Sequence, residues 1–378
     1  MNILFIVHES SRTGAPMALL CLMKKMKAEL PHFNFTVLMM EEGPLVDDFR
    51  ELGYVIVPRG KPWKLRNIFV PDGFRDRLVI RCLLLLLKHR HFDLIYANSA
   101  MSLDCAIILK ENLGVPVLLH FHESFINLCY IHVSKSKICQ CDHFIAVSQK
   151  AQESLVFLGA KEDKIHLVYP TSDFVGKLIE GDDGMEKHIE KNGKSKFKIG
   201  FVGPLIERKG ADLLPVFAKR MKDKYPECDF EVLSIGNHLE RGRKSLEYDA
   251  ERLEVLEKFR FVQPMNNPIP EYKDIDVLLV LSREESFSLV VLELGLLGKP
   301  SVLFDGSCGI QHFLLNDVNS ILVPYLDVEA AVDAVYSLYN DRNKCLRLGQ
   351  HLKDVLTDYY TKVNANDEII RLLQTLTK

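Results

Sequence analysis

Two acidic residues, Glu285 and Glu293, lie eight positions apart in "EESFSLVVLELGLLGKP", a stretch that is otherwise mostly apolar. An unpaired buried carboxylate is costly, whereas one that accepts hydrogen bonds from sugar or ribose hydroxyls is stabilised. The stretch also predicts a helix, whose first amides around Phe287 to Leu289 would be free to bind a phosphate. This combination indicates a site for a nucleotide sugar. The structural alternative is a helix-start charge at Glu285 and a paired core acid at Glu293.

A second group of candidate residues lies in "KIGFVGPLIERKG". A strand is predicted to end at Gly203, and Arg208 and Lys209 follow it just before the next helix. Cations beyond the carboxyl end of a strand are placed to bind a phosphate and to neutralise a departing diphosphate. A solvated basic loop is the alternative interpretation for either residue alone.

The composition is that of an ordinary globular protein. The chain has 378 residues, which favours two domains, and 47% of them are hydrophobic and 26% charged. The formal net charge of -3 gives no reason to expect a nucleic acid partner, since that binding needs a concentrated basic face.

The nine cysteines have irregular spacing, and no signal peptide pattern is recognisable before them, so we expect a reducing, cytoplasmic compartment. The pair in "CQC", Cys139 and Cys141, lacks a second pair of ligands at zinc spacing. Asp274 and Asp276 open a strand and therefore face the wrong end of the sheet for a site. We expect no metal and no other cofactor.

Short apolar strands alternate with longer helical patterns, which is typical of parallel sheets covered by helices on both faces. A charged, Gly-rich stretch, "EGDDGMEKHIEKNGKSK", separates two such halves and predicts a hinge. Ligands of these folds bind beyond the carboxyl ends of the strands. The predicted strands are Asn2–Val7, Phe33–Met40, Asp93–Asn98, Pro116–Phe121, His143–Ser148, Lys198–Gly203, Asp229–Gly236, Phe259–Pro264, Ile275–Ser282 and Pro300–Asp305.

The order "FVGPLIERKG", "DVLLVLSREESFSLVVLELGLLGKPSV" and "GIQHFLLNDVNSILV" resembles the second domain of the family 4 retaining glycosyltransferases, which carry a Glu, seven residues, Glu motif. The first half is similar through "ESSRTGAPMALLCL", "LLHFHES" and "FIAVSQKAQESLVFLGAKEDKIHLVYP". The resemblance implies an α/β GT-B fold, in which two doubly wound Rossmann-like domains face each other across a cleft. We expect an acceptor-side domain at 1–172, a linker at 173–196, a nucleotide-sugar-binding domain at 197–355 and a C-terminal helix at 356–378 that crosses back to the first domain.

The resemblance also implies roles for individual residues. Glu285 and His122 would contact the donor sugar, and Lys209 would hold the leaving phosphate. The donor-binding residues would be Gly14, Arg208, Lys209, Ser286, Phe287, Ser288, Leu289 and Glu293. We expect His120 to point to the opposite face of its strand from His122.

The chain departs from the family pattern at three places. Pro204 follows Gly203, where family members commonly carry an Arg, and Arg208 is a candidate substitute. A single-Gly "TGAP" replaces the frequent Gly-Gly loop, and "VYPTSD" replaces the usual Asn-Gly after the last strand of the first domain. These changes weaken the inference of donor choice and of activity.

The function implied is metal-independent transfer of a hexose, with retention, from a UDP- or GDP-sugar to a hydroxyl of a glycan or lipid-linked acceptor in surface polysaccharide or glycoconjugate synthesis. The basic segment from Arg59 to Phe92 could lie on anionic lipid, or be a solvated face, so we expect a cytoplasmic protein, free or peripheral at the membrane. A nucleotide-sugar binder without transferase activity and a GT-B epimerase stay open. A nicotinamide enzyme is disfavoured because G-x-G-x-x-G is missing after the first strand.

Overall fold

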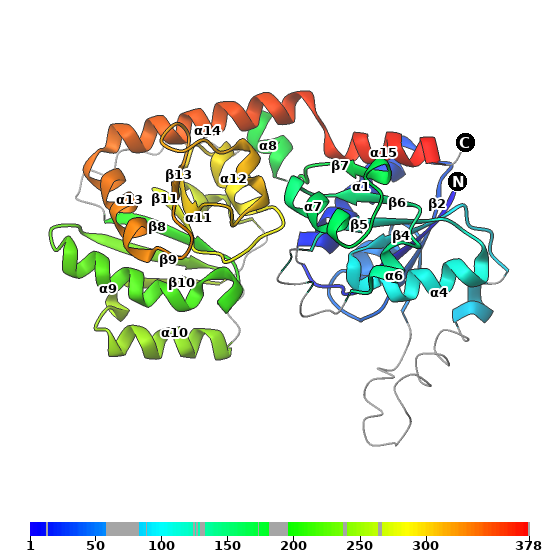
Figure 1. The fold of residues 1–378 in the computed structure, drawn as a ribbon, viewed down its shortest axis with the longest axis horizontal. Coiled ribbons are helices and arrows are strands. Elements are labelled where there is room, and N and C mark those ends of the chain that lie inside the picture. Colours follow the sequence, from blue (N-terminus) through cyan, green and yellow to red (C-terminus); the bar gives the residue numbers. More distant parts are fainter. Residues whose placement is uncertain are drawn as a thin grey trace, which may run out of the picture. The chain divides into compact units, whose positions relative to one another are not determined.

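The computed structural model describes residues 1–12, 14–57, 83–87, 89–123, 125, 128, 133–172, 174–180, 196–236, 240–263 and 267–376. The chain divides into two compact units (Figure 1). The first combines Met1–Ser172 with Asn364–Lys378, and the second is Asp173–Val363. No helix in these described ranges is both long and apolar enough to cross a membrane.

The first unit is built on a parallel sheet of seven strands in the order β3-β2-β1-β4-β5-β6-β7. Its central strands are buried along their length, as expected for a sheet with helices on both faces. The strands are β1 Asn2–Val7, β2 Asn34–Met39, β3 Tyr54–Ile56, β4 Leu94–Asn98, β5 Val117–Phe121, β6 His143–Ala146 and β7 Ile165–Leu167. The helices are α1 Gly14–Glu29, α2 Val46–Arg50, α4 Leu103–Leu113, α6 Lys135–Ile138, α7 Gln149–Phe157 and α15 Ala365–Leu376, with 3-10 turns η2 Ala100–Ser102 and η3 Glu162–Lys164.

The second unit is built on a parallel sheet of six strands in the order β10-β9-β8-β11-β12-β13. Helices α9, α10 and α13 pack together, and α8, α12 and α14 form another group. The strands are β8 Phe197–Val202, β9 Phe230–Ile235, β10 Phe259–Val262, β11 Val277–Val280, β12 Ser301–Phe304 and β13 Ile321–Val323. The helices are α8 Val175–Glu180, α9 Leu214–Lys224, α10 Glu240–Arg252, α11 Ile269–Lys273, α12 Leu289–Leu296, α13 Val328–Asn340 and α14 Arg342–Lys362, with 3-10 turns η4 Glu207–Lys209, η5 Ala211–Leu213, η6 Leu256–Lys258 and η7 Gly309–Phe313.

In each sheet the strand order reverses at the first strand. β1 lies between β2 and β4, and β8 lies between β9 and β11. In doubly wound sheets the loops at the carboxyl ends of such neighbouring strands diverge and leave room for a ligand. The loops after β1 and β4, and those after β8 and β11, are therefore where functional side chains are expected to gather.

All ten predicted strands are present, and three short strands, β3, β7 and β13, were not predicted. The boundaries between the two units differ at two places from the predicted domain boundaries. Helix α8, placed in the predicted linker, packs against α12 and α14 within the second unit, and 181–195 lie outside the described residues. Helix α14 continues to Lys362, so the segment that joins the first unit begins at Asn364 and not at position 356. There α15 packs on α1, where Lys25 Nζ lies 2.9 Å from Asp367 Oδ1.

The basic segment from Arg59 to Phe92 falls largely outside the described residues, which resume at 83. In its described part Leu83 and Leu87 are buried, whereas Leu85 and Leu86 are more than half exposed. Membrane contact by this segment stays a prediction.

Glycines allow α12 and α14 to pack closely in the second unit. A Cβ placed on Gly349 of α14 would lie only 1.9 Å from the carbonyl oxygen of Gly298, which ends α12 with a φ of +74°. A Cβ on Gly295 would likewise lie 2.5 Å from Leu356 Cδ1. Because α12 carries Glu293, this contact sets the position of that carboxylate.

We predict that Gly349→Ala lowers the free energy of unfolding by about 1 to 3 kcal/mol, since a backbone carbonyl cannot yield to the added methyl group. Gly176→Ala in α8 is the matched control, because a Cβ there meets nothing within 4 Å. Its expected effect is neutral or stabilising by up to about 1 kcal/mol. Urea unfolding of both variants measures this difference, and equal stability of the two would contradict the packing argument.

Candidate functional site

A lysine and a glutamate from neighbouring strand ends form an ion pair in the second unit. Lys209 is the last residue of η4 after β8, and Glu285 lies in the loop between β11 and α12. Lys209 Nζ donates to Glu285 Oε1 at 2.7 Å, and the Ser282 hydroxyl donates to the same oxygen at 2.5 Å. The two charged side chains are only 14% and 10% exposed. Lys209 and Glu285, both expected to contact a donor, therefore lie together in the structure.

The backbone of Glu285 is fixed by the loop that follows β12. Its amide donates to the carbonyl of Ser307 at 2.8 Å, and its carbonyl accepts from the amide of Gly309 at 3.0 Å. Because both backbone groups are bonded, the carboxylate has a defined direction toward Lys209.

A bidentate pair joins the loop that carries Lys209 to the loop that carries Glu285. Arg283 donates to both carboxylate oxygens of Asp212 at 2.9 Å and also donates to the carbonyl of Glu207. Two-point pairs of this kind are among the stronger side-chain interactions and hold a defined geometry. Arg283 and Asp212 were not singled out from the sequence, because they lie 71 positions apart and nothing in the sequence indicates that they pair, although each is close to a quoted motif.

Arg208 and Gly210 complete this connection between the loops. Arg208 Nη1 donates to the carbonyl of Glu284 at 3.0 Å, and its own carbonyl accepts from the Arg283 amide at 2.9 Å. Gly210 has a φ of +75°, and a Cβ there would lie 2.0 Å from the Leu281 carbonyl oxygen. Only glycine fits this close approach. The 3-10 turn η5 follows Gly210, and the helix α9 begins at Leu214.

The start of α12 differs from the prediction by two residues. The helix begins at Leu289, and Ser288 is its N-cap, with its hydroxyl 3.5 Å from the Val291 amide. Ser286 and Phe287 precede the helix, and Phe287 is buried with its carbonyl accepting from Cys308 Sγ at 2.7 Å. The amides at the helix start are therefore those of Ser288 to Val290 and not those around Phe287.

A small hollow lies between the ion pair and the start of α12. Its volume is about 10 Å³, enough for about one water molecule, and Lys209, Ser282, Glu285, Ser288 and Val290 are part of its lining. Of the residues predicted to bind a donor, the structure thus brings Lys209, Glu285 and Ser288 together.

Glu293 is buried on α12 with 7% of its surface exposed. Its charge adds to the burial that raises the pKa of Tyr272 in α11, so its carboxylate lies within electrostatic reach of that residue. Glu293 is not among the described residues that line the small hollow.

In the first unit, three neighbouring strands place polar residues at their carboxyl ends. His8 follows β1, Ser99 follows β4, and His122 and Glu123 follow β5. The Glu123 carboxylate accepts from the amides of Ala100 at 2.8 Å and His122 at 2.9 Å. The Ser99 hydroxyl lies 2.9 Å from His8 Nδ1. Glu123 therefore ties the end of β4 to the end of β5 and fixes the backbone at His122.

Ser99 is held in a strained conformation, with a φ of +113°. Non-glycine residues of this kind cluster at functional sites, where the surrounding structure imposes them. The Ser99 hydroxyl also accepts from the Met101 amide at 3.1 Å, so this turn is fixed from both sides.

The prediction that His120 and His122 point to opposite faces is wrong. Their ring centroids are 4.0 Å apart, because residues two positions apart in a strand point to the same face. His120 Nδ1 is bonded to the Tyr96 hydroxyl at 2.6 Å, whereas His122 Nε2 is enclosed with no hydrogen-bond partner in the described part of the chain. Burial lowers the pKa of His122 to about 3, so the ring is neutral near pH 7.

Gly14 is the first residue of α1 and not part of a preceding loop. A Cβ at this position would meet nothing within 4 Å, so no protein atom of the described residues requires glycine here. The close approach of a ligand at Gly14 stays a prediction.

The predicted absence of a metal stays a prediction as well. Within the ranges that the structure describes, no group of three His, Cys, Asp or Glu side chains is arranged to hold a metal ion. Asp274 pairs with Lys198, and Asp276 pairs with Arg342 at 2.7 Å and accepts from the Lys198 amide.

Two family models match the sequence. Residues 184–355 match the model described as Glycosyl transferases group 1, and residues 32–173 match Glycosyltransferase Family 4. The chain belongs to the family 4 glycosyltransferases. A D-inositol 3-phosphate glycosyltransferase of Kribbella flavida is 30% identical over 66% of this chain and 64% of its own length. The protein of the same name from Corynebacterium urealyticum matches over 43% of its length, so the chain spans between about two fifths and two thirds of the length of these relatives.

Solved structures of other glycosyltransferases share the fold of this family 4 member. Anabaena HepE in complex with UDP aligns with a TM-score of 0.78 at 18% identity, over 99% of this chain and 100% of that one. The apo form of the lipopolysaccharide outer core galactosyltransferase WaaB aligns with a TM-score of 0.74 at 15% identity, over 99% of both chains. The two doubly wound units are those of the GT-B fold.

The buried carboxyl of Glu123 makes the stability of the protein depend on pH. Burial raises the pKa of Glu123 from 4.5 to about 7, although hydrogen bonds from the backbone of Ala100 and His122 oppose the shift. The native state therefore holds the proton more tightly than the unfolded chain does. The stabilisation from Glu123 is complete below pH 4.5 and is lost as the pH rises to about 7.

We predict that the free energy of unfolding of Glu123→Gln, which has no titrating group, rises relative to that of wild type as the pH increases across this window. The variant has one acceptor oxygen fewer for the amides of Ala100 and His122 at every pH, so the difference at pH 4.5 is the baseline of the comparison. The difference in the free energy of unfolding should grow by at most about 1.4 kcal/mol per pH unit between pH 4.5 and 7 and then stay constant. Urea unfolding at a series of pH values measures it. His120 and His122, whose pKa values are lowered, affect both proteins alike on the acid side. A difference that does not vary with pH would contradict the assignment.

Proposed function

We propose that the protein is a retaining glycosyltransferase that moves a sugar from a nucleotide-diphosphate sugar to a hydroxyl of a glycan or lipid-linked acceptor, without a metal. The observation that carries the proposal is the ion pair between Lys209 and Glu285 beside the start of α12. A cation and free helix amides suit the diphosphate of such a donor, and a carboxylate that accepts hydrogen bonds suits its sugar hydroxyls.

Each group has a defined task in this proposal. Lys209 and the amides of Ser288 to Val290 bind the diphosphate, which combines a fixed charge with the positive end of the α12 dipole. Glu285 accepts hydrogen bonds from hydroxyls of the transferred sugar, and Glu293 accepts those of the ribose. In the first unit His122 contacts the transferred sugar, the role that the family resemblance implies.

The reaction breaks the bond between the anomeric carbon and the diphosphate oxygen, and the electron pair leaves with the nucleoside diphosphate. The acceptor oxygen forms its bond on the same face, and its proton passes to the departing phosphate oxygen. Charge grows on the leaving group as the bond lengthens, so Lys209 and the helix amides stabilise the transition state more than the bound donor. Because the departing phosphate oxygen takes the proton of the acceptor, these steps do not require His122 to act as a base.

The donor is proposed to carry uridine. The structures of Anabaena HepE with UDP and with UDP-glucose support this choice, because that protein shares the fold of this chain over nearly its whole length. A surface glycan is the proposed acceptor. It is supported by a structural neighbour named as a lipopolysaccharide outer core galactosyltransferase and by a relative named for the cps region of Klebsiella pneumoniae.

We predict that UDP-glucose raises the melting temperature of the protein more than GDP-glucose or ADP-glucose does, because a ligand that binds only the native state stabilises it. Lys209→Met should reduce that increase, since the diphosphate loses its cation. Thermal denaturation with each sugar nucleotide at equal concentration measures the effect. A melting temperature that none of the three sugar nucleotides changes would count against a nucleotide-sugar site.

We predict that Lys209→Met and Glu285→Gln each lower the rate of transfer from the donor by roughly 10² to 10³, the range for loss of one group that stabilises developing charge. Lys219→Met is the matched control, because Lys219 lies on the exposed side of α9, paired with Asp223. Release of UDP, with and without a saccharide acceptor, measures the rate, and the anomeric configuration of the product reports retention.

Three outcomes separate the alternatives. Donor binding without UDP release in wild type would identify a nucleotide-sugar binder. A changed sugar nucleotide formed without any acceptor would identify an epimerase. Transfer that survives Glu285→Gln unchanged would exclude the proposed role of the ion pair.

A further inference from the structure

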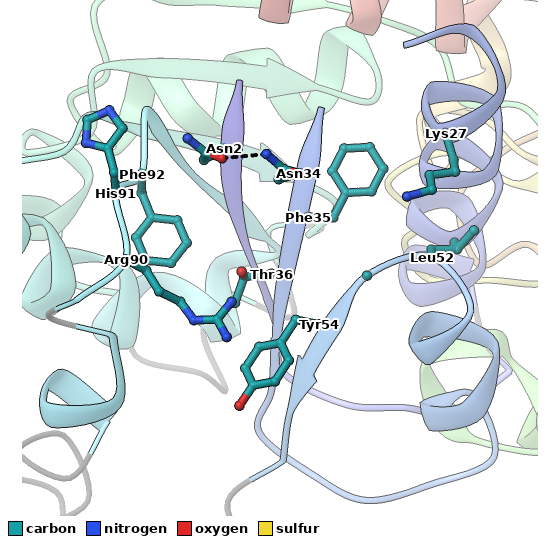
Figure 2. Close-up of a pocket in the computed structure, with 11 residues that line it drawn as sticks. Asn2, Lys27, Asn34, Phe35, Thr36, Leu52, Tyr54, Arg90, His91 and Phe92 are labelled. Atoms are coloured by element: carbon teal, nitrogen blue, oxygen red, sulfur yellow. Dashed lines mark hydrogen bonds between the residues drawn. The ribbon is translucent and has the colours of Figure 1, made fainter. Parts of the chain in front are cut away.

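The described residues form a larger hollow at the amino edge of the first sheet, but its charged side chains do not converge on one ligand (Figure 2). Its volume is about 480 Å³, and it lies where β1, β2 and β3 begin. Lys27 lies with Phe35 on the face of the sheet that α1 covers. Arg90 lies over the ring of Tyr54 on the opposite face, with its guanidinium carbon 3.9 Å from the ring centroid. The polar groups that do converge at short distance lie beside the ion pair of the second unit.

One oxygen of the Glu285 carboxylate receives two hydrogen bonds. Lys209 Nζ donates to Oε1 at 2.7 Å, and the Ser282 hydroxyl donates to the same atom at 2.5 Å. The distance from the hydroxyl is that of a strong hydrogen bond to an ionised group. Ser282 is therefore a second direct partner of the carboxylate, besides the lysine of the ion pair.

The other oxygen of this carboxylate is open to a ligand. Oε2 of Glu285 forms no hydrogen bond with any residue that the structure describes. It is also not among the enclosed polar atoms of those residues that lack a partner, so its surface is accessible. A carboxylate oxygen can accept a hydrogen bond, and a sugar hydroxyl can donate one. Oε2 is thus the oxygen that can meet an incoming sugar.

The backbone on both sides of Ser282 is fixed. Ser282 follows β11 and is only 2% exposed. The Leu281 carbonyl before it lies so close to Gly210 that a Cβ there would be 2.0 Å from its oxygen. The Arg283 amide after it donates to the Arg208 carbonyl at 2.9 Å. These two contacts tie Ser282 to the loop that follows β8 and restrict the directions in which its hydroxyl can point.

The two partners of Oε1 respond differently when a donor binds. In the proposed function the ammonium of Lys209 turns toward the diphosphate, which weakens its hold on Glu285. The Ser282 side chain is short and buried, and it has no part in binding the diphosphate. Its hydrogen bond is therefore the one that keeps the carboxylate oriented in the complex with the donor.

We propose that Ser282 is a positioning residue for the donor sugar. Its hydroxyl holds Oε1 of Glu285 while Lys209 binds the diphosphate, so that Oε2 accepts the hydrogen bond of a sugar hydroxyl. Glu285 then recognises the sugar through one oxygen, in a direction that Ser282 sets. This role rests on the proposed function, in which Glu285 contacts the transferred sugar.

The test compares the binding of UDP-glucose with that of UDP, which lacks the sugar, in titration calorimetry of the full chain. We expect Ser282→Ala to weaken the binding of UDP-glucose by about tenfold, the effect of losing one hydrogen bond to a charged group. The affinity for UDP should stay unchanged, because the diphosphate and the nucleoside keep their contacts. A purely structural role of Ser282 would instead weaken the binding of both ligands alike.

A second measurement places Ser282→Ala in a Glu285→Ala background. With the carboxylate gone, the serine has nothing to orient, so the affinity of Glu285→Ala for UDP-glucose should change by less than about twofold on adding Ser282→Ala. A further loss of about tenfold in this background would show that Ser282 does not act through Glu285, and would overturn the proposal.

Ser301→Ala is the matched control. Ser301 is a fully buried serine at the start of β12 in the same unit, and its hydroxyl has no hydrogen-bond partner among the described residues. This variant should bind UDP and UDP-glucose like wild type, which separates the loss of the Ser282 hydrogen bond from the loss of any buried hydroxyl.

The outcomes distinguish failure of the proposed function from failure of this role. Wild type that binds neither ligand, or Glu285→Ala that binds UDP-glucose as tightly as wild type, would overturn the proposed function and the role of Ser282 with it. Loss of UDP-glucose affinity in Glu285→Ala but not in Ser282→Ala would overturn the role of Ser282 alone. An equal loss of affinity for both ligands in Ser282→Ala would do the same.

Discussion

The ion pair between Lys209 and Glu285 is the interaction on which the second unit's site depends. Its two charges are 2.7 Å apart and largely shielded from water, so each is stabilised mainly by the other. The pair satisfies the charges in the absence of a ligand and keeps both side chains ordered. In the proposed function, a bound diphosphate competes with Glu285 for the ammonium of Lys209, and sugar hydroxyls replace that ammonium at the carboxylate. A donor bound in this way would exchange one set of charged hydrogen bonds for another and meet side chains that are already in place.

The pair keeps this geometry because the loops that carry it are tied together. Arg283 and Asp212 join them through two hydrogen bonds, and Gly210 lets one backbone approach the Leu281 carbonyl. In the first unit, neighbouring strand ends are also joined by a side chain. There the Glu123 carboxylate accepts hydrogen bonds from backbone amides at the ends of two strands. In both units the strands are buried, so polar side chains can gather only where the strands end. Rigid strand ends and short tied loops supply the precision that a transfer site needs.

Local sequence patterns predicted the ten longer strands, and the order of motifs, through the family resemblance, assigned Lys209 and Glu285 to one donor site. Those features depend on apolar runs and on the order of motifs. The strand β3, Tyr54–Ile56, has only three residues and begins with an exposed tyrosine, so it carries no such run. The N-cap at Ser288 could have been recognised from its residue type, but the apolar Phe287 extended the predicted helix by two residues. Glu123, Ser99 and Arg283 form hydrogen bonds to residues that are distant in the sequence. The periodicity of a single sequence does not predict such contacts.

The contacts of Arg208 and Arg283 show what the replacement of the family's Arg by Pro204 changes at this site. Family members commonly place an Arg there, which would add a second cation near the diphosphate. Arg208 is no free substitute, because one of its nitrogens holds the Glu284 carbonyl, and Arg283 is neutralised by Asp212. In the proposed function Glu285 binds sugar hydroxyls, which leaves the charge of Lys209 for the diphosphate. Arg208 and Arg283, the other cations of the two loops, keep their protein partners. In the proposed function, stabilisation of the leaving group therefore rests more heavily on Lys209 and on the α12 amides than it would with an Arg at position 204.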